Sequence, residues 1–148
     1  MDWGQILVGS LAGGSAGAIM AFLSFIAPRF GAGNFIQDNN EEKFAFGRPI
    51  SRREASLIGL LIHLLLSTLF GFGFALGVEL GWIPGYLYLP MLGWCVVVSL
   101  FLGIVILPLE GYGFFGAKHD AWFFVDSLLT NFLWGHLFLV LMRLWLVV

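Results

Sequence analysis

Pro108-Leu-Glu-Gly-Tyr-Gly-Phe-Phe115 has a second copy earlier in the chain, at Pro28-Arg-Phe-Gly-Ala-Gly-Asn-Phe35. Both stretches read P-x-x-G-x-G-x-F, and each follows a long apolar run. Proline disfavours helical geometry in the residue before it, so each copy is expected to end a helix. The repetition predicts two similar halves, each with an apolar segment, a Pro/Gly turn and a second apolar segment containing one histidine. We therefore predict an all-α fold, a four-helix transmembrane bundle of two sequential hairpins related by a pseudo-two-fold axis along the membrane normal.

The composition is that of a membrane protein. The chain has 148 residues, of which 59% are hydrophobic and 11% charged. Soluble domains average about 45–50% apolar and about 25% charged residues. A soluble domain of this size would leave much of that apolar surface in water. The net charge of −2 without a basic tract argues against nucleic-acid binding. The single Cys95 excludes an intrachain disulfide and a CxxC redox pair.

Four apolar runs are long enough to cross a bilayer, which takes about 20 residues. We predict one transmembrane domain over residues 1–148, with helices at about 6–27, 52–79, 89–107 and 121–147. Ser51 and Glu54 have the S-x-x-E spacing of a capping box, which marks the start of the second helix. In the first helix, small residues recur at four-residue spacing and predict a close packing face, within the bundle or against a partner subunit. They are Gly9, Gly13, Gly17 and Ala21.

The distribution of basic residues predicts the orientation. The connections after the first and third helices, with the first turn of the second helix, carry six of the seven Lys and Arg residues. Cytoplasmic loops of membrane proteins are enriched in these residues. We therefore expect loops 28–51 and 108–120 in the cytoplasm, both termini outside, and a multi-pass protein in the inner (plasma) membrane.

Two histidines in the apolar runs are candidate ligands, because ionisable residues in hydrocarbon are costly and often functional. His63 and His136 lie in the corresponding helices of the two halves. They could supply both axial bonds of a haem b iron, or each could bind one chlorophyll-type magnesium. Ser67 belongs to a small, polar stripe around His63 that would leave room for a macrocycle. Arg143 is expected to anchor its helix end at the membrane interface, although it could also stabilise a propionate or a lipid phosphate. Equally, each histidine could bond to a neighbouring helix and only hold the bundle together. The stripe consists of Ser56, Gly59, His63, Ser67 and Gly71.

Other ionisable residues lie near the predicted inner face. We expect Asp126 to cap its helix or to be hydrated at the interface, although with Glu110 it could help a proton to enter or leave. His119 is expected to be solvated, and Asp120 is a suitable N-cap for the fourth helix. The chain has no GxSxG, HExxH or P-loop motif, so we predict no enzymatic activity.

The chain resembles a group of small bacterial four-helix membrane proteins of unknown function. The similarity lies in Ala27-Pro28, Ile62-His63-Leu64, Leu107-Pro108 before Gly-x-Gly-Phe-Phe, and Gly135-His136-Leu137. It covers most of the chain except an insertion at 37–51. The resemblance implies a compact four-helix membrane fold with two intramembrane histidines, and it implies no reaction.

These patterns lead to a functional hypothesis and an alternative. The first is a non-catalytic accessory subunit of a respiratory or photosynthetic electron-transfer complex, with haem b or a (bacterio)chlorophyll-type pigment on His63 and His136. Its partners would be the lipid bilayer and other membrane subunits, or a second copy, bound through the small-residue face of the first helix. The alternative is a small channel or transporter with the polar stripe lining its path. A membrane-embedded electron carrier acting alone is a third possibility.

Overall fold

The computed structural model describes residues 1–26, 43–45, 48–109, 112–118 and 122–146. Within these ranges, four helical segments are long and apolar enough to cross a membrane. They are α1 (Trp3–Ile26), α2 (Arg52–Glu79), a composite of α3 (Tyr88–Phe101), η2 (Leu102–Ile106) and α4 (Leu107–Leu109), and α5 (Phe123–Leu146). The predicted four-helix, all-α architecture is confirmed, and each predicted helix end lies within one turn of the observed end.

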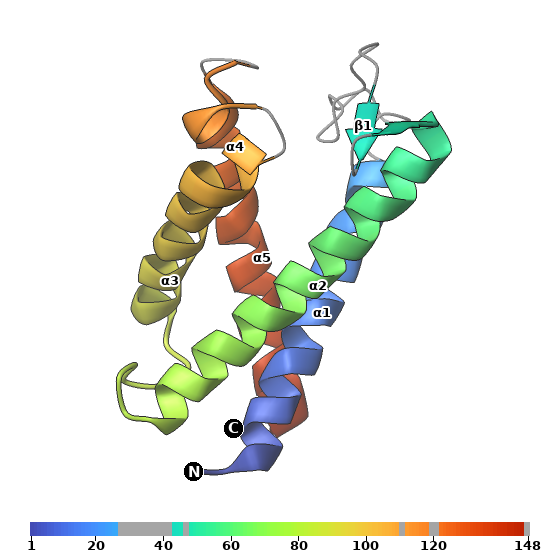
Figure 1. Ribbon diagram of the computed structural model, residues 1–148. Helices are drawn as coiled ribbons and strands as arrows, with labels where there is room; N and C mark the ends of the chain where they lie inside the picture. The colour runs from blue at the N-terminus through green and yellow to red at the C-terminus, as the bar shows by residue number, and fades with distance from the viewer. Residues whose placement is uncertain (27–42, 46–47, 110–111, 119–121, 147–148) are drawn as a thin grey trace.

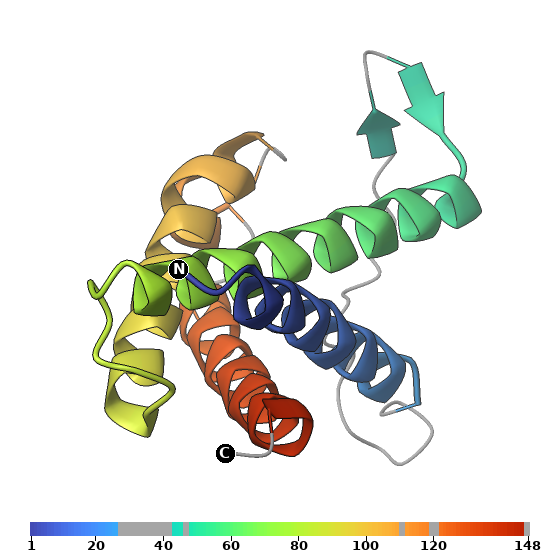
Figure 2. The same cartoon turned by 90° about the horizontal axis from the view of Figure 1, so that it is seen from below.

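The helices run up and down, so both termini lie at the same end of the bundle, opposite α4 and β1 (Figure 1). α1 packs most extensively on α2 and also contacts α5, whereas α5 packs on α3. The two central helices are therefore α1 and α5. The N-terminal half of α2 runs obliquely away from α3 and α5, as the two views show (Figures 1 and 2). The pseudo-two-fold relation stays a prediction, because the first P-x-x-G-x-G-x-F copy lies outside the described residues.

The start of α2 has the predicted capping box. The backbone nitrogen of Glu54 donates to Ser51 Oγ at 3.2 Å, and the backbone nitrogen of Ser51 donates to Glu54 Oε2 at 2.8 Å. Two of the amide groups that a helix N-terminus leaves without an intrahelical partner are thereby satisfied. The helix begins at Arg52 for this reason, at the position that the sequence predicts.

The glycine ridge of α1 packs against α2. Gly9, Gly13 and Gly17 are buried. A Cβ atom on Gly13 would lie 2.4 Å from the Ser67 backbone oxygen and 2.8 Å from the Gly71 Cα atom. Only glycine allows two helix backbones to approach this closely. Of the two alternatives predicted for this face, packing within the bundle is the one observed, so a partner subunit has to bind elsewhere.

The third crossing continues past Pro108 because it contains a π-helical segment. The backbone N–H of Leu107 donates to the Leu102 carbonyl, five residues earlier. Proline lacks an N–H group and its ring clashes with the carbonyl four residues before it. The wider π turn accommodates this proline, so the helix ends at Leu109 and not at Leu107 as predicted.

The described end of the second P-x-x-G-x-G-x-F copy lies in a tight turn between α4 and α5. Phe114–Gly116 is a single 3₁₀ turn, η3, in which Phe115 has a φ of 54°. The Phe115 ring occupies the space beside Gly103 of η2, where a Cβ atom would lie 2.5 Å from its Cδ1. Its ring also meets Phe124 of α5 edge to face at 4.9 Å. Phe115 therefore packs between the end of the third crossing and the start of α5.

A short antiparallel hairpin precedes α2 and was not predicted. Its strands are β1 (Lys43–Ala45) and β2 (Arg48–Ile50), with Lys43 opposite Ile50. The sequence predicts a loop here, because three-residue strands are too short to produce a recognisable alternation of apolar and polar residues.

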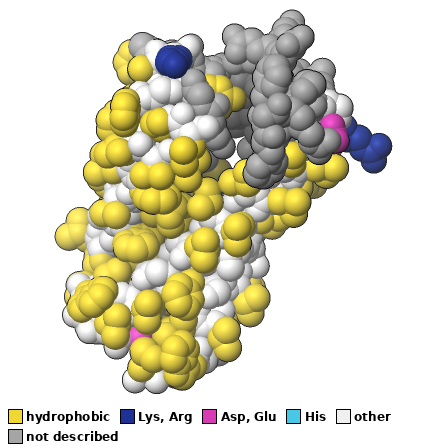
Figure 3. Space-filling view, in the orientation of Figure 1, with side chains coloured by type: hydrophobic (Ala, Val, Ile, Leu, Met, Phe, Trp, Pro, Cys, Tyr) yellow, Lys and Arg dark blue, Asp and Glu magenta, His cyan; other side chains and the backbone are white. Residues whose placement is uncertain are grey.

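The surface has the polarity of a membrane-spanning bundle. Charged side chains lie near its two ends, and a broad apolar band lies between them (Figure 3). Inside, Phe74 of α2 meets Phe138 of α5 edge to face at 5.6 Å. Trp134 is 5% exposed and stacks on Phe138. The bundle therefore has an aromatic core inside an apolar outer band, which is consistent with a multi-pass membrane protein.

Candidate functional site

His63 of α2 is partly buried and bonds to α1. Its Nε2 lies 3.0 Å from the Gly17 backbone oxygen. A carbonyl oxygen only accepts hydrogen bonds, so Nε2 carries the proton and donates it, and Nδ1 remains as an acceptor. This is the helix-to-helix bond that the packing interpretation of His63 describes. Nε2 of His63 is therefore occupied by this hydrogen bond and is not available to bind a metal.

His136 has different surroundings. It is exposed on α5, and its Nδ1 contacts the hydroxyl of Tyr88, the first residue of α3. Leu133 and Val140, one turn before and after it, are 46% and 40% exposed. His136 therefore lies on an apolar face of α5 that is turned towards lipid or another subunit. Its Nε2 is the ring nitrogen that Tyr88 does not engage.

The structure does not bring the two histidines to one site. His63 contacts α1 and His136 contacts α3. Gly17, the partner of His63, lies about three turns before Pro28, whereas Tyr88 lies more than about five turns before Pro108. Because their helix partners lie at different positions relative to the two prolines, the histidines are not equivalent in the two halves.

A small cavity lies between α1, α2, η2 and α5. Its volume is about 70 Å³, and it contacts His63 but not His136. Pockets for organic ligands measure about 300–1,000 Å³, so a macrocycle does not fit here. The apolar side chains around it are those of Met20, Leu66, Phe70 and Leu102. The polar ones are His63, Ser67, Thr130, Asn131 and Trp134.

Ser67 lies on this cavity one turn after His63. Its side chain is 6% exposed. A Cβ atom on Gly17 would lie 2.5 Å from Ser67 Oγ, so α1 covers the stripe at Ser67. Ser67 therefore packs on the glycine ridge of α1, and its role beside a macrocycle stays a prediction.

Asn131 connects α5 to α3 beside the cavity. Ser99 Oγ donates to the Cys95 carbonyl oxygen at 2.8 Å, so it can accept the bond from Asn131 Nδ2, also at 2.8 Å. The Cys95 thiol donates to the Asn131 backbone oxygen at 3.2 Å. Cys95 and Ser99 are both fully buried, as expected for a packing role.

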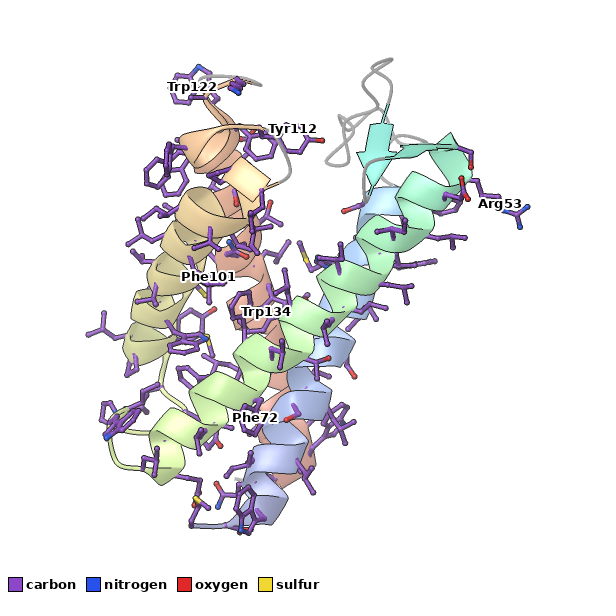
Figure 4. The ribbon with its side chains drawn as sticks, in the orientation of Figure 1. Arg53, Phe72, Phe101, Tyr112, Trp122 and Trp134 are labelled. Atoms are coloured by element: carbon purple, nitrogen blue, oxygen red, sulfur yellow. The ribbon has the colours of Figure 1, made fainter. Side chains whose placement is uncertain are left out.

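Trp134 is the residue that the sequence analysis missed. Its Nε1 donates to the Gly13 backbone oxygen at 3.1 Å, and its ring lies between α5 and α2 (Figure 4). It thereby connects the glycine ridge of α1 with the aromatic core and one wall of the cavity. One of six tryptophans in an apolar run has no distinguishing pattern, although the adjacent Gly135 indicates close packing of this part of α5.

The remaining ionisable candidates lie near helix ends. Arg143 is exposed in the last turn of α5, where a cation is favourable to the helix dipole and can extend to the interface. Asp126 is exposed in the first turn of the same helix, as predicted for an interfacial residue. Glu110, His119 and Asp120 lie outside the described residues.

The connection between α2 and α3 contains a buried polar group, the hydroxyl of Tyr86. The Tyr86 hydroxyl has no hydrogen-bond partner within the part of the chain that the structure describes. Burial raises the pKa of Tyr86 to about 12, and the carboxylates of Glu79 and Asp2 add to this effect. Tyr86 is therefore a neutral group near the end of the bundle that holds the termini.

Comparisons with protein-family models, with curated proteins and with solved structures find no match to this chain. The resemblance to small bacterial four-helix membrane proteins therefore stays a prediction.

Proposed function

We propose that this protein is a non-catalytic accessory subunit of a larger membrane complex, held in the membrane by its four helices with the termini outside. The observation that carries the proposal is the incomplete packing of α2. Only 17% of its most apolar membrane-spanning window is buried. Its N-terminal half leaves α3 and α5 (Figure 2). Ser56 and Gly59 of the stripe belong to that half of the helix.

Two parts of the α2 stripe have different environments. At Gly71, an added Cβ atom would lie 2.5 Å from the Gly9 backbone oxygen. At Gly59, an added Cβ atom would meet no described residue within 4 Å, and Ser56 beside it is exposed. Small residues in a membrane helix allow a second backbone to approach, and a serine hydroxyl can bond to it. The Ser56/Gly59 face is thus the surface on which we place a helix of the partner subunit.

The stripe does not favour the channel or transporter alternative. Gly71 is closed by α1, and the core residues Phe74 and Phe138 lie beyond it, both fully buried. The polar groups around His63 and Ser67 therefore end in an apolar core within the described bundle. This arrangement supports a scaffold with a lateral contact surface more than a path across the membrane.

The partner surface predicts a selective effect of Gly59→Leu. This substitution fills the space for the second backbone, so we expect it to abolish assembly while the isolated subunit keeps its fold. Gly93→Leu on α3 is the matched control, because an added Cβ atom there also meets nothing within 4 Å. The measurement is the mass of the tagged protein extracted from native membranes in a mild detergent. Migration of the unsubstituted chain as a free 16.4 kDa species would overturn the proposal.

The electron-transfer part of the proposal depends on His136. The residues around His63 do not fit a tetrapyrrole, because Nε2 is bonded to Gly17 and the cavity is small. His136 lies on an exposed apolar face, and a proton on its Nδ1 would leave Nε2 free to bind a metal. A hydrogen bond to the other nitrogen is the usual support of a histidine ligand. Of the predicted modes, one histidine binding one metal is the mode that this geometry favours.

An absorption spectrum tests the pigment assignment. We expect the purified complex to have a Soret band that His136→Ala removes and His63→Ala leaves in place. A colourless complex with both histidines intact would contradict pigment binding. A Soret band that disappears only in His63→Ala would place the pigment on His63 and would contradict binding by His136.

A further inference from the structure

The cavity beside His63 has the size and chemistry of a water site. We propose that it binds ordered water, which joins α2 to α5 in the interior of the membrane. A water molecule occupies about 30 Å³ in the liquid, so about 70 Å³ accommodates about two. An apolar cavity of such a size would stay empty, whereas a polar cavity is expected to be hydrated.

Three side chains on the cavity offer the bonds that a buried water molecule needs. His63 uses Nε2 for the Gly17 carbonyl and keeps Nδ1 as an acceptor. Asn131 uses Nδ2 for Ser99, which leaves Oδ1 as an acceptor. The hydroxyl of Ser67 can both donate and accept, and its side chain on the cavity wall is only 6% exposed. Buried waters typically make about three bonds to such groups.

The backbone around the cavity supports the same conclusion. Leu102, on the cavity wall, is the first residue of the π-helical segment η2. Short π segments within helices are frequent at functional sites because they change the packing of side chains locally. α1 packs against both α2 and α5, whereas α2 and α5 make few direct contacts with each other. Water bonded to both helices would supply a direct connection between them.

The cost of an empty cavity argues for water as the occupant. Polar groups that lack a partner in an apolar surrounding are costly, and here the Ser67 hydroxyl, the Asn131 side-chain carbonyl and the His63 ring nitrogen would all share that cost. Lipid chains cannot satisfy these groups, since they have neither donors nor acceptors. A single small neutral molecule that both donates and accepts satisfies them all.

Water-edited solid-state NMR of histidine-labelled protein in liposomes tests the site. We expect rapid magnetisation transfer from water to the His63 ring and a several-fold slower transfer in Ser67→Ala. Ser56→Ala is the matched control on the same helix, since Ser56 is exposed and lies off the cavity. Transfer to His63 that is absent in the unsubstituted protein, or unchanged in Ser67→Ala, would overturn the proposal.

A measurement on the unsubstituted protein makes the test independent of any variant. Xenon binds empty apolar cavities and should not enter a hydrated one. We therefore expect no xenon-induced shift of resonances from Leu66 or Leu102 under xenon pressure. Shifts at these residues would show a dry cavity and would contradict the water site, whatever the outcome for the accessory-subunit function.

Discussion

Gly13→Val should prevent α1 from packing on α2 and should lower the free energy of unfolding by about 3 kcal/mol, at the upper end of the range for overpacked cores. The expected loss is large because a side chain at position 13 would meet backbone atoms of α2. The first added carbon would lie 2.4 Å from the Ser67 carbonyl oxygen and 2.8 Å from the Gly71 Cα atom. Both are backbone atoms of a helix, so neither can move aside without displacing the whole of α2.

Gly59→Val is the control that separates this effect from helix propensity. It makes the same chemical change in a membrane helix, but its first added carbon would meet nothing within 4 Å among the residues that the structure describes. We expect its free energy of unfolding to stay within about 0.5 kcal/mol of the unsubstituted value, as for most exposed positions. Titration with SDS in mixed micelles measures both variants. Equal losses for the two valines would contradict the observed α1–α2 interface.

The contrast between these glycines shows what could be predicted from the sequence. The spacing of Gly9, Gly13 and Gly17 identifies a close packing face, and the structure confirms one. The same spacing does not say which helix packs there, because any second backbone satisfies it. Both a partner subunit and α2 were compatible with the pattern, and only the three-dimensional arrangement identifies α2.

The histidines show a similar limit. Their positions in two apolar helices follow from the sequence, and so does the cost of placing them there. Which helix each one contacts depends on rotation and tilt, which periodicity does not determine. His63 turns to Gly17 and His136 to Tyr88, although the repeat suggested equivalent positions. The π segment is a further case, because Pro108 predicts a helix end but not the wider turn that carries the helix past it.

Trp134→Ala is expected to produce the other large loss of stability, about 3 kcal/mol, the lower end of the range for removing a buried Phe or Trp. In lipid the unfolded helices remain in an apolar solvent, so the loss comes from packing and the cavity left behind more than from hydrophobic transfer. Trp134 is 5% exposed, and Gly135 beside it packs closely on Cys95 and Met91. The surrounding helices therefore have little freedom to close the space.

Trp134→Phe separates the contribution of the hydrogen bond from that of ring packing. Phenylalanine keeps most of the ring stacked on Phe138 but removes the bond from Nε1 to the Gly13 carbonyl oxygen. A hydrogen bond contributes about 0.5–1.5 kcal/mol, so we expect Trp134→Phe to cost about 1 kcal/mol and Trp134→Ala to cost about three times as much. Trp82→Ala serves as the control, because Trp82 is 80% exposed at the turn before α3. If Trp134→Ala and Trp82→Ala reduce the free energy of unfolding equally, Trp134 does not join α1 to the aromatic core in the folded protein.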